Sequence, residues 1–337
     1  MNSRKSQDLS NQTKNNSKSN VNGALPLVIV NPKSAGGSTA GRWAERAADV
    51  RAHFGAFQVA FTKRAGDGTA LALRGAEQGR KFIIACGGDG TINEVANGIL
   101  QSGADIEFGV LPSGTGGDFR RTIGMPNDTR AAAAALRGGV TKQIDVGKVT
   151  FLNHAGETAS RYFLNVASFG LSASIIERVK TSNKMDWLPH DILRGKTSFA
   201  LSTLQEILGL NFETVRVRFD DREEKPLNTI NFCVCNSRFF GGGMKIAPAA
   251  VINDGFFDVV NIGDIKTAKI LLNAYKLYGG SHLSLEEVKT TLARKIEVSP
   301  VNNEEIHIEV DGELPGKLPA VFEILPNALK VRVPKNK

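Results

Sequence analysis

Three short runs of apolar residues, each followed by a loop of small residues, constrain the fold more than any other feature of the sequence. The runs are Leu27–Val30, Phe82–Cys86 and Phe108–Leu111. A strand that is apolar on both faces must be covered on both, as parallel strands are when they lie between two layers of helices. Helical patterns follow at 41–53, 70–78, 92–100 and 130–137, and a further strand is expected at 57–62. We therefore expect an α/β domain with a parallel sheet over residues 24–147.

The second half of the chain is dominated by strand patterns. Turn residues separate short runs that predict strands at 161–166, 213–219, 229–235, 255–262, 295–299, 306–310, 320–325 and 329–333. Helical stretches interrupt them at 173–209 and 267–278. Many short strands indicate an antiparallel sandwich or a barrel. We expect a β-rich domain over residues 148–325, while the segment 326–337 could complete the first domain.

The length and charge of the chain limit its domains and its partners. It has 337 residues, with 42 Lys and Arg against 34 Asp and Glu, a formal net charge of +8. This length favours two domains. The positive charge favours anionic partners, whether nucleic acid, nucleotide or acidic membrane, without choosing among them. No apolar run approaches the ~20 residues that span a bilayer.

The first 23 residues differ in composition from the rest of the chain. Residues 1–23 are rich in Asn and Ser and poor in apolar side chains, so we expect a disordered polar tail there. The tail lacks the continuous apolar stretch of a secretion signal, and export is therefore not expected. A membrane tether remains an alternative reading of its lysines.

The cysteines and histidines do not have the spacing of metal ligands. Cys86, Cys233 and Cys235 are expected to be buried thiols in a reducing compartment. The five histidines are scattered and are expected on the surface or in strands: His53, His154, His190, His282 and His307.

The loop after Phe82–Cys86 has the strongest chemical signal. It reads Gly87-Gly88-Asp89-Gly90-Thr91 and opens a helix, where backbone N–H groups and the helix dipole favour an anion such as phosphate. A carboxylate beside phosphates calls for a cation such as Mg²⁺ between them. The alternative is a tight turn in which Asp89 caps the helix. The sequence contains no G-x-x-x-x-G-K-[ST] loop, so an ordinary P-loop ATPase is not expected.

Two further loops repeat this design. One contains Ser113-Gly114-Thr115-Gly116-Gly117-Asp118, and the other is the segment 31–37. Because the carboxyl ends of parallel strands meet at one edge of a sheet, the three loops together predict a polyphosphate site there. Asp145 ends a strand-like segment and either joins this edge or is an ordinary strand-end residue.

Several motifs in the same order resemble the catalytic domain of diacylglycerol, sphingosine and ceramide kinases, most closely the bacterial soluble lipid kinases. The motifs are Val30-Asn31-Pro32-Lys33-Ser34, Gly87-Gly88-Asp89-Gly90-Thr91, Leu111-Pro112-Ser113-Gly114-Thr115, Phe163–Gly170, Gly241–Pro248, Asn253-Asp254-Gly255 and Asp311-Gly312-Glu313. They span about residues 25–334. The resemblance implies an α/β domain that binds ATP, a β-rich domain that binds lipid, and an active site in the cleft between them.

The resemblance also implies roles for individual residues. ATP would be held by Asn31, Pro32, Lys33, Ser34, Ala35, Thr62, Gly88, Asp89, Gly90, Thr91, Ile92, Asn93, Glu94 and Thr115. Asp89, Asp118, Asp145 and Asp311 would arrange the catalytic Mg²⁺ and its waters. Glu313 matches the general base that takes the proton of the lipid hydroxyl. Asp254, with the carbonyl groups of Val251 and Phe256, matches a second, structural Mg²⁺ site.

The residues around Glu313 are consistent with that role. Residues 306–310 alternate as a strand does, and Asp311-Gly312-Glu313 is expected to be the turn after it, with two acids that can serve one site. Without the resemblance, a solvated hairpin turn would be the default interpretation.

Two positions depart from the family pattern. Gly117 stands where Asn usually precedes the Asp, and Ala35 stands where Gly is common after the Ser. Neither change removes a carboxylate, so we expect activity to survive, with the affinity for nucleotide in question.

The sequence as a whole predicts a cytoplasmic, ATP-dependent lipid kinase that associates transiently with a membrane surface. The segment 180–189 mixes lysines with Met, Trp and Leu and either docks on an acidic bilayer or packs as a helix. The alternatives are a kinase like NAD kinase or phosphofructokinase, and a silent protein that binds nucleotide or membrane. A nucleic-acid partner is not expected, since no basic stripe with aromatic residues is present. A homodimer is left open, and the residues name no particular lipid.

Overall fold

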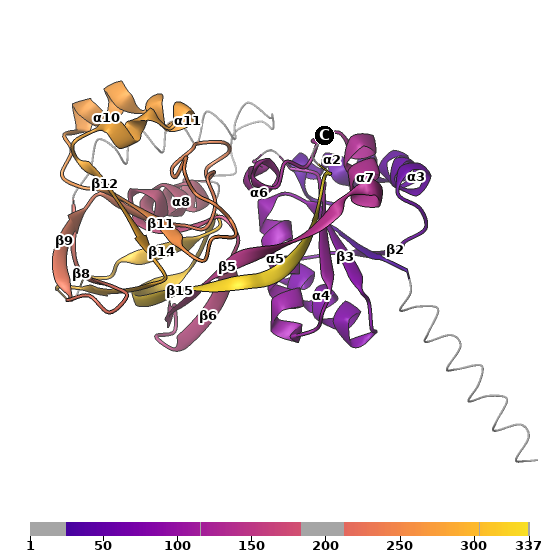
Figure 1. The fold of residues 1–337 in the computed structure, drawn as a ribbon, viewed down its shortest axis with the longest axis horizontal. Coiled ribbons are helices and arrows are strands. Elements are labelled where there is room, and N and C mark those ends of the chain that lie inside the picture. Colours follow the sequence, from indigo (N-terminus) through magenta and orange to yellow (C-terminus); the bar gives the residue numbers. More distant parts are fainter. Residues whose placement is uncertain (1–24, 115, 183–211, 303, 336–337) are drawn as a thin grey trace, which may run out of the picture. The chain divides into compact units, whose positions relative to one another are not determined.

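The computed structural model describes residues 25–114, 116–182, 212–302 and 304–335 (Figure 1). The chain falls into two units. The first comprises residues up to 115, together with 123–142 and 329–337, and the second comprises 116–122 and 143–328. The chain therefore passes from one unit to the other four times, at 115/116, 122/123, 142/143 and 328/329.

The first unit contains the expected parallel sheet. Its strands pair in the order β4-β3-β1-β2, with β1 Leu27–Val30, β2 Gln58–Phe61, β3 Phe82–Gly87 and β4 Glu107–Pro112. All three of these pairings are parallel. The last residues of the long strand β15 (Glu313–Val333) also pair with β4 in parallel, at Lys330 and Val331. Every residue of β1 and β3 is buried, as their apolar sequences predict.

Helices cover this sheet on both faces. α3 (Trp43–His53) packs with α7 (Thr129–Gly138) on one side, and α4 (Asp67–Glu77) packs with α5 (Asp89–Ser102) on the other (Figure 1). The α4–α5 contact is close because α5 carries a glycine there. A Cβ atom on Gly98 would lie 2.4 Å from the carbonyl oxygen of Thr69, so this face of α5 requires glycine. The short helices η1 (Ala35–Gly37) and α2 (Ser38–Gly41) follow β1.

The second unit is rich in antiparallel strands. Its strands are β5 Val140–Asn153, β6 Thr158–Phe163, β7 Val166–Gly170, β8 Glu213–Phe219, β9 Lys225–Thr229, β10 Asn231–Cys235, β11 Phe257–Ile262, β12 Val288–Ala293, β13 Lys295–Pro300, β14 His307–Val310 and most of β15. One path runs β12-β11-β10-β7-β14-β15, and β13 joins β15 to β8. The helices α6 (Asp118–Thr122), α8 (Leu171–Ser182), α10 (Thr267–Asn273), α11 (Lys276–Gly279) and η2 (Ser281–Ser284) accompany them.

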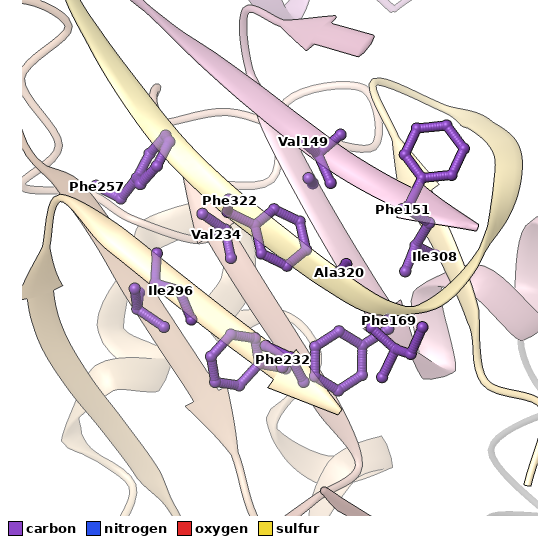
Figure 2. Close-up of a cluster of buried hydrophobic side chains, with 14 of the residues drawn as sticks. Val149, Phe151, Phe169, Phe232, Val234, Phe257, Ile296, Ile308, Ala320 and Phe322 are labelled. Atoms are coloured by element: carbon purple, nitrogen blue, oxygen red, sulfur yellow. The ribbon is translucent and has the colours of Figure 1, made fainter. Parts of the chain in front are cut away.

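Aromatic side chains fill the core of the second unit (Figure 2). Phe169 stacks on Phe232 with ring centroids 5.0 Å apart, and Phe163 stacks on Phe257 at 5.6 Å. β10 is buried on both faces, because its alternate residues enter this cluster and a second one that contains Cys233 and Cys235. All three cysteines are buried free thiols, as expected, and burial raises the pKa of Cys86 to about 12.

Some sequence predictions need correction. The strands expected at 320–325 and 329–333 are one continuous strand, β15, which runs through Pro326 and through Asn327 despite its positive φ of 55°. Asp145 lies inside β5 rather than at a strand end. His282 is buried in η2, neither on the surface nor in a strand. The predicted helical segment 173–209 and the predicted membrane-docking segment 180–189 both continue past residue 182. Their parts within 183–211 lie outside the described residues.

Among the described residues, no helix is both long and apolar enough to cross a membrane.

Candidate functional site

The glycine loop between β3 and α5 has the geometry of an anion-binding turn. α5 begins at Asp89, and the residue before it, Gly88, is extended and has no side chain to bond the N–H groups of the first turn. N–H groups at the start of a helix can bind an anion, and the helix dipole adds a partial positive charge beside them. Asp89 is thus the first residue of the helix rather than its cap.

The second loop lies directly against the first. A Cβ atom on Gly114 would be 2.5 Å from the Cα atom of Gly88, and the Ser113 N–H donates to the Gly87 carbonyl at 2.9 Å. A Cβ atom on Gly87 would be 2.5 Å from the Thr91 hydroxyl oxygen. Both loops therefore need glycine at the point of contact, which leaves backbone rather than side chains there. Thr115, the next residue, lies outside the described residues.

The loop after β1 joins the other two through side chains. The Asn31 amide donates to the Thr91 hydroxyl at 3.0 Å, and its Oδ1 accepts the Lys33 N–H at 2.9 Å. The Ser34 hydroxyl donates to the Asn31 carbonyl at 2.7 Å and contacts the Thr39 hydroxyl, which in turn bonds Ser113. Three loops at the carboxyl ends of β1, β3 and β4 thus form one hydrogen-bonded cluster. Pro32 follows Asn31 within it.

Ala35 occupies a backbone conformation that favours glycine. Its φ is +53°, in the left-handed region where a Cβ atom costs about 1 kcal/mol. Gly36 and Gly37 follow with φ of 66° and 86°. The strain at Ala35 gives a physical reason why glycine is common at this position of the family pattern.

Glu94 and Thr62 bond backbone groups around the end of β2 and the loop that follows it. The two carboxylate oxygens of Glu94 accept the N–H groups of Gly66 at 2.8 Å and Gly68 at 2.9 Å. Thr62 is buried and its N–H donates to the Val30 carbonyl at 2.9 Å. A shallow hollow of about 410 Å³ adjoins this loop and is lined by Phe61, Lys63, Arg64, Asp67, Leu71 and Arg74. Backbone N–H groups of Lys63 and Arg64 lower the pKa of the Asp67 carboxyl.

Three more of the residues expected to bind ATP lie in α5. Ile92 and Asn93 are buried, and the Asn97 amide donates to the Asn93 carbonyl and side chain at 2.9 and 3.1 Å. Gly90 leaves open space where a Cβ atom would be. These contacts stabilise the helix whose first turn faces the glycine loops.

In the second unit, Asp118 is buried in a network of its own. Its Oδ1 accepts Arg121 at 2.9 Å, and its Oδ2 accepts the Gly242 N–H at 2.8 Å. Gly243 has a φ of +113°, and a Cβ atom there would approach the Arg121 guanidinium to 3.3 Å. The glycine run 241–243 thus wraps the Asp118–Arg121 ion pair. Gly117 has a φ of +71°, which Asn also tolerates.

Asp145 uses both carboxylate oxygens to hold backbone. They accept the N–H groups of Gly255 at 2.7 Å and Asn327 at 2.8 Å, and Asp145 is 1% exposed. The Asn236 amide donates to the carbonyls of Asp145 and Leu164, both at 3.0 Å. Asp145 therefore ties β5 to β15 and to the loop before β11.

Asp311 anchors the hairpin that carries Glu313. With a φ of +46°, it accepts the N–H groups of the segment 164–166 at 2.8, 2.9 and 3.2 Å. Beneath the turn, the buried carboxylate of Glu309 accepts Ser168 and the Gly312 N–H. The turn is thus held from two sides.

Glu313 is the first residue of β15 and pairs with an arginine. Arg161 Nη1 lies 2.7 Å from Glu313 Oε2, and the Glu313 side chain is 39% exposed. A carboxylate oriented by an ion pair and still open to solvent can accept a proton from a bound hydroxyl group.

Of the three residues predicted for the structural metal site, Asp254 supplies the side-chain carboxylate. Asp254 Oδ1 accepts the Phe256 N–H at 3.0 Å, and Val251 is partly exposed. Burial, with the nearby charge of Asp254, raises the pKa of Asp258 to about 6. Two carboxyl groups that repel each other suit a divalent cation. Even so, no group of three or more metal-ligating side chains occurs in the described ranges.

Four residues that support the predicted ones could not be identified from the sequence. Arg161 pairs with Glu313, Arg121 with Asp118, Glu309 holds the hairpin turn, and Asn236 holds Asp145. Arg161 and Asn236 act on partners far away in the chain, and Glu309 bonds the distant Ser168 as well as the nearby Gly312. Arg121 and Glu309 lie within three residues of recognised motifs, which was the signal that the sequence offered for them.

Comparisons with known proteins agree with this arrangement. The family model of the diacylglycerol kinase catalytic domain matches residues 26–149, and that of the YegS C-terminal NAD kinase beta sandwich-like domain matches residues 165–333. A diacylglycerol kinase of Bacillus subtilis (strain 168) is 30% identical over 277 residues, which is 82% of this chain and 85% of the relative. One of Mycobacterium tuberculosis (strain CDC 1551 / Oshkosh) is 30% identical over 260 residues, 77% of this chain and 79% of the relative.

A solved structure has the same fold. The crystal structure of a diacylglycerol kinase from Bacillus anthracis str. Sterne superposes with a TM-score of 0.70 at 24% identity, covering 92% of this chain and 96% of that one. The matched family models and the relatives identify an α/β kinase with a β-rich second unit. The chain belongs to the diacylglycerol kinase family, and it is a lipid kinase.

Proposed function

We propose that this enzyme transfers the γ-phosphate of ATP to the hydroxyl group of diacylglycerol. The observation that carries the proposal is the close backbone contact between the loops of Gly88 and Gly114, in a chain whose relatives are diacylglycerol kinases. A ceramide-type lipid presents a similar hydroxyl group and is the second choice of acceptor. The proposed reaction needs no partner other than the lipid. Formation of a homodimer stays a hypothesis.

ATP fits the first unit on the chemistry of its residues. Helix N–H groups and glycine backbone at 88 and 114 suit the phosphates, and the polar loop of Asn31, Lys33 and Ser34 adjoins them. Thr62 and the nearby hollow would accept the nucleoside end. Each of these residues binds and orients; none reacts.

Mg²⁺, when bound, would neutralise charge that develops on the transferred phosphoryl group. We propose Asp89, Asp118, Asp145 and Asp311 as the residues that arrange it and its waters. Because the oxygens of Asp118 and Asp145 already accept backbone or arginine N–H groups, they would act by orienting waters. Asp254, with the carbonyl groups of Val251 and Phe256, is proposed to hold a structural ion.

Glu313 is the proposed general base. Arg161 and the Asp311-anchored turn hold its carboxylate in place. A lipid hydroxyl group hydrogen-bonded to that carboxylate would pass it a proton as the hydroxyl oxygen attacks the γ-phosphorus of ATP, and ADP would leave with the electrons of the broken bond. The lipid lies in a bilayer, so the enzyme must visit a membrane surface from the cytoplasm.

Transfer of radiolabelled phosphate tests the proposal. In mixed micelles, label from ATP should appear on diacylglycerol, and Glu313→Gln and Asp89→Ala should lower kcat by about 10²- to 10⁴-fold. Glu223→Gln, which changes an exposed acid between β8 and β9, is the matched control and should keep full activity.

Other outcomes lead to other functions. Label on NAD or a sugar phosphate, and none on any lipid, would establish a small-molecule kinase, the alternative that the name of the C-terminal family model favours. No transfer to any acceptor with nucleotide still bound would indicate a silent binding protein. Full activity in both site variants would refute the assigned roles.

A further inference from the structure

The helical segment α10–α11 exposes an unusual row of large apolar side chains. Leu271 is 42% exposed, Leu272 74%, Tyr275 69% and Tyr278 60%. Tyr275, between the two helices, has helical dihedral angles, so the backbone is nearly continuous from 267 to 279 (Figure 1). Side chains at these spacings of one, three and three residues lie on one face of a helix.

The opposite face of the same segment packs inward. Leu277 packs against the buried cluster of Cys233, Cys235 and Ile246, and the Leu277 carbonyl accepts the Lys245 N–H at 2.8 Å. The segment therefore has two apolar faces, one in the core and one in solvent. An ordinary surface helix would have polar residues at 271, 272, 275 and 278.

The charged side chains within the segment itself are of one sign. Residues 266–285 contain Lys266, Lys269 and Lys276 and no Asp or Glu. Lys269 is paired with Glu287 at 2.6 Å, and Lys266 is exposed. Tyrosine is enriched where a protein meets the headgroup layer of a membrane, because its ring is apolar and its hydroxyl group is polar.

We propose that the row Leu271, Leu272, Tyr275 and Tyr278 docks the enzyme on an anionic lipid bilayer, with Lys266 and Lys276 against the headgroups. The proposal rests on the proposed function, because a diacylglycerol substrate lies in such a bilayer. An isologous contact with a second copy of the chain would place these same lysines near one another, which like charge opposes. A bilayer with acidic headgroups satisfies both the apolar row and the lysines.

Vesicle sedimentation tests the docking surface directly. Wild-type protein should pellet with phosphatidylglycerol–phosphatidylcholine vesicles, and the double variant Leu272→Ser/Tyr275→Ser should bind roughly tenfold or more weakly, since two apolar side chains no longer enter the interface. Val301→Ser removes an exposed apolar side chain outside the row and is the matched control, expected to bind as wild type does. Tyr275→Trp should preserve binding, because it keeps an interfacial aromatic ring.

The lysines give a second, independent measurement. Lys266→Gln/Lys276→Gln should lower affinity for anionic vesicles by about fivefold per lysine and leave binding to pure phosphatidylcholine unchanged. Unchanged binding of the Leu272→Ser/Tyr275→Ser protein, with its fold confirmed by circular dichroism, would overturn the proposal. A shift of that variant from dimer to monomer, with vesicle binding intact, would assign the row to self-association instead.

Docking and catalysis can fail separately. If the chain phosphorylates no lipid but loses vesicle binding in the double variant, the docking surface stands and the proposed function falls. If transfer to a short-chain diacylglycerol dissolved as monomers is equal in wild type and double variant while vesicle binding is also equal, the proposed function stands and the docking surface falls.

Discussion

Several buried or half-buried polar side chains of the second unit act on backbone groups. Asp145 and Asp311 together accept five backbone N–H groups, two at Asp145 and three at Asp311. Such charge-assisted bonds are stronger than neutral ones and fix the geometry of the segments they hold. At the scale of the residue, these carboxylates position the loops from which Glu313 and Asp254 project.

The burial of His282 leads to a prediction about how folding stability depends on pH. His282 is 3% exposed, its Nε2 lies 3.0 Å from the Ile246 carbonyl, and the backbone of Lys276 also lies beside the ring. Burial lowers the pKa of His282 below its ordinary 6.5 in the folded state. The unfolded chain therefore binds more protons below pH 6.5, so folding stability is full above that pH and falls as the pH drops through it.

The prediction is tested by measuring the denaturation midpoints of wild type and His282→Gln between pH 5 and pH 8. This range extends roughly a unit or more to either side of the ordinary histidine pKa. Glutamine keeps a donor for the Ile246 carbonyl but does not titrate. The variant should lose part of the decline seen at acidic pH. His53→Gln, at an exposed site, is the control, and identical pH curves for wild type and His282→Gln would contradict the prediction.

At the scale of the element, the contact between two strand–loop–helix turns shapes the proposed phosphate site. Gly87 and Gly88 precede α5, and Gly114 follows β4; the three meet with no room for a Cβ atom on Gly114 or Gly87. Neighbouring parallel strands bring the loops together, and glycine permits the approach. The glycines were visible in the sequence, but which of them touch was not.

Gly114→Ala should therefore impair nucleotide binding more than stability. The new Cβ atom would lie 2.5 Å from the Gly88 Cα atom, so one loop must move by about an ångström, a displacement that can cost on the order of 10²-fold in activity. Gly138→Ala, at the end of α7, has open space and is the control. ATP affinity by calorimetry gives the result, and an unchanged value would show that the loops adjust freely.

At the scale of the whole molecule, each unit is built from separate parts of the chain. The last strand residues return to the first unit, where Leu329 and Val331 are buried and Val331 pairs with Phe108 of β4. Arg332 forms an ion pair with Glu107 and lies over the Phe82 ring, 4.5 Å from its centroid. The first unit is thus completed by residues that follow the second unit in the sequence.

Truncation before Leu329 should consequently destabilise the first unit. It removes the strand beside β4 and three buried apolar side chains, Leu329, Val331 and Val333, each worth about 1.5–3 kcal/mol. That sum approaches the whole stability of an ordinary domain. Thermal unfolding should lose its cooperative transition in the first unit, whereas truncation before Lys335 should not change it. Equal melting temperatures for both truncations would refute this reading.

The sequence by itself determined the local elements and the chemical types of the site. Apolar runs predicted β1, β3 and β4, and the motifs supplied the hypothesis of which carboxylates and glycines form the site, because both kinds of pattern depend on side chains a few residues apart. Only the tertiary structure decided that Arg161 faces Glu313, that Asn236 holds Asp145, and that β15 continues through Pro326 and Asn327. Those contacts join residues distant in the chain, and their energies depend on distance and burial, which no local pattern contains.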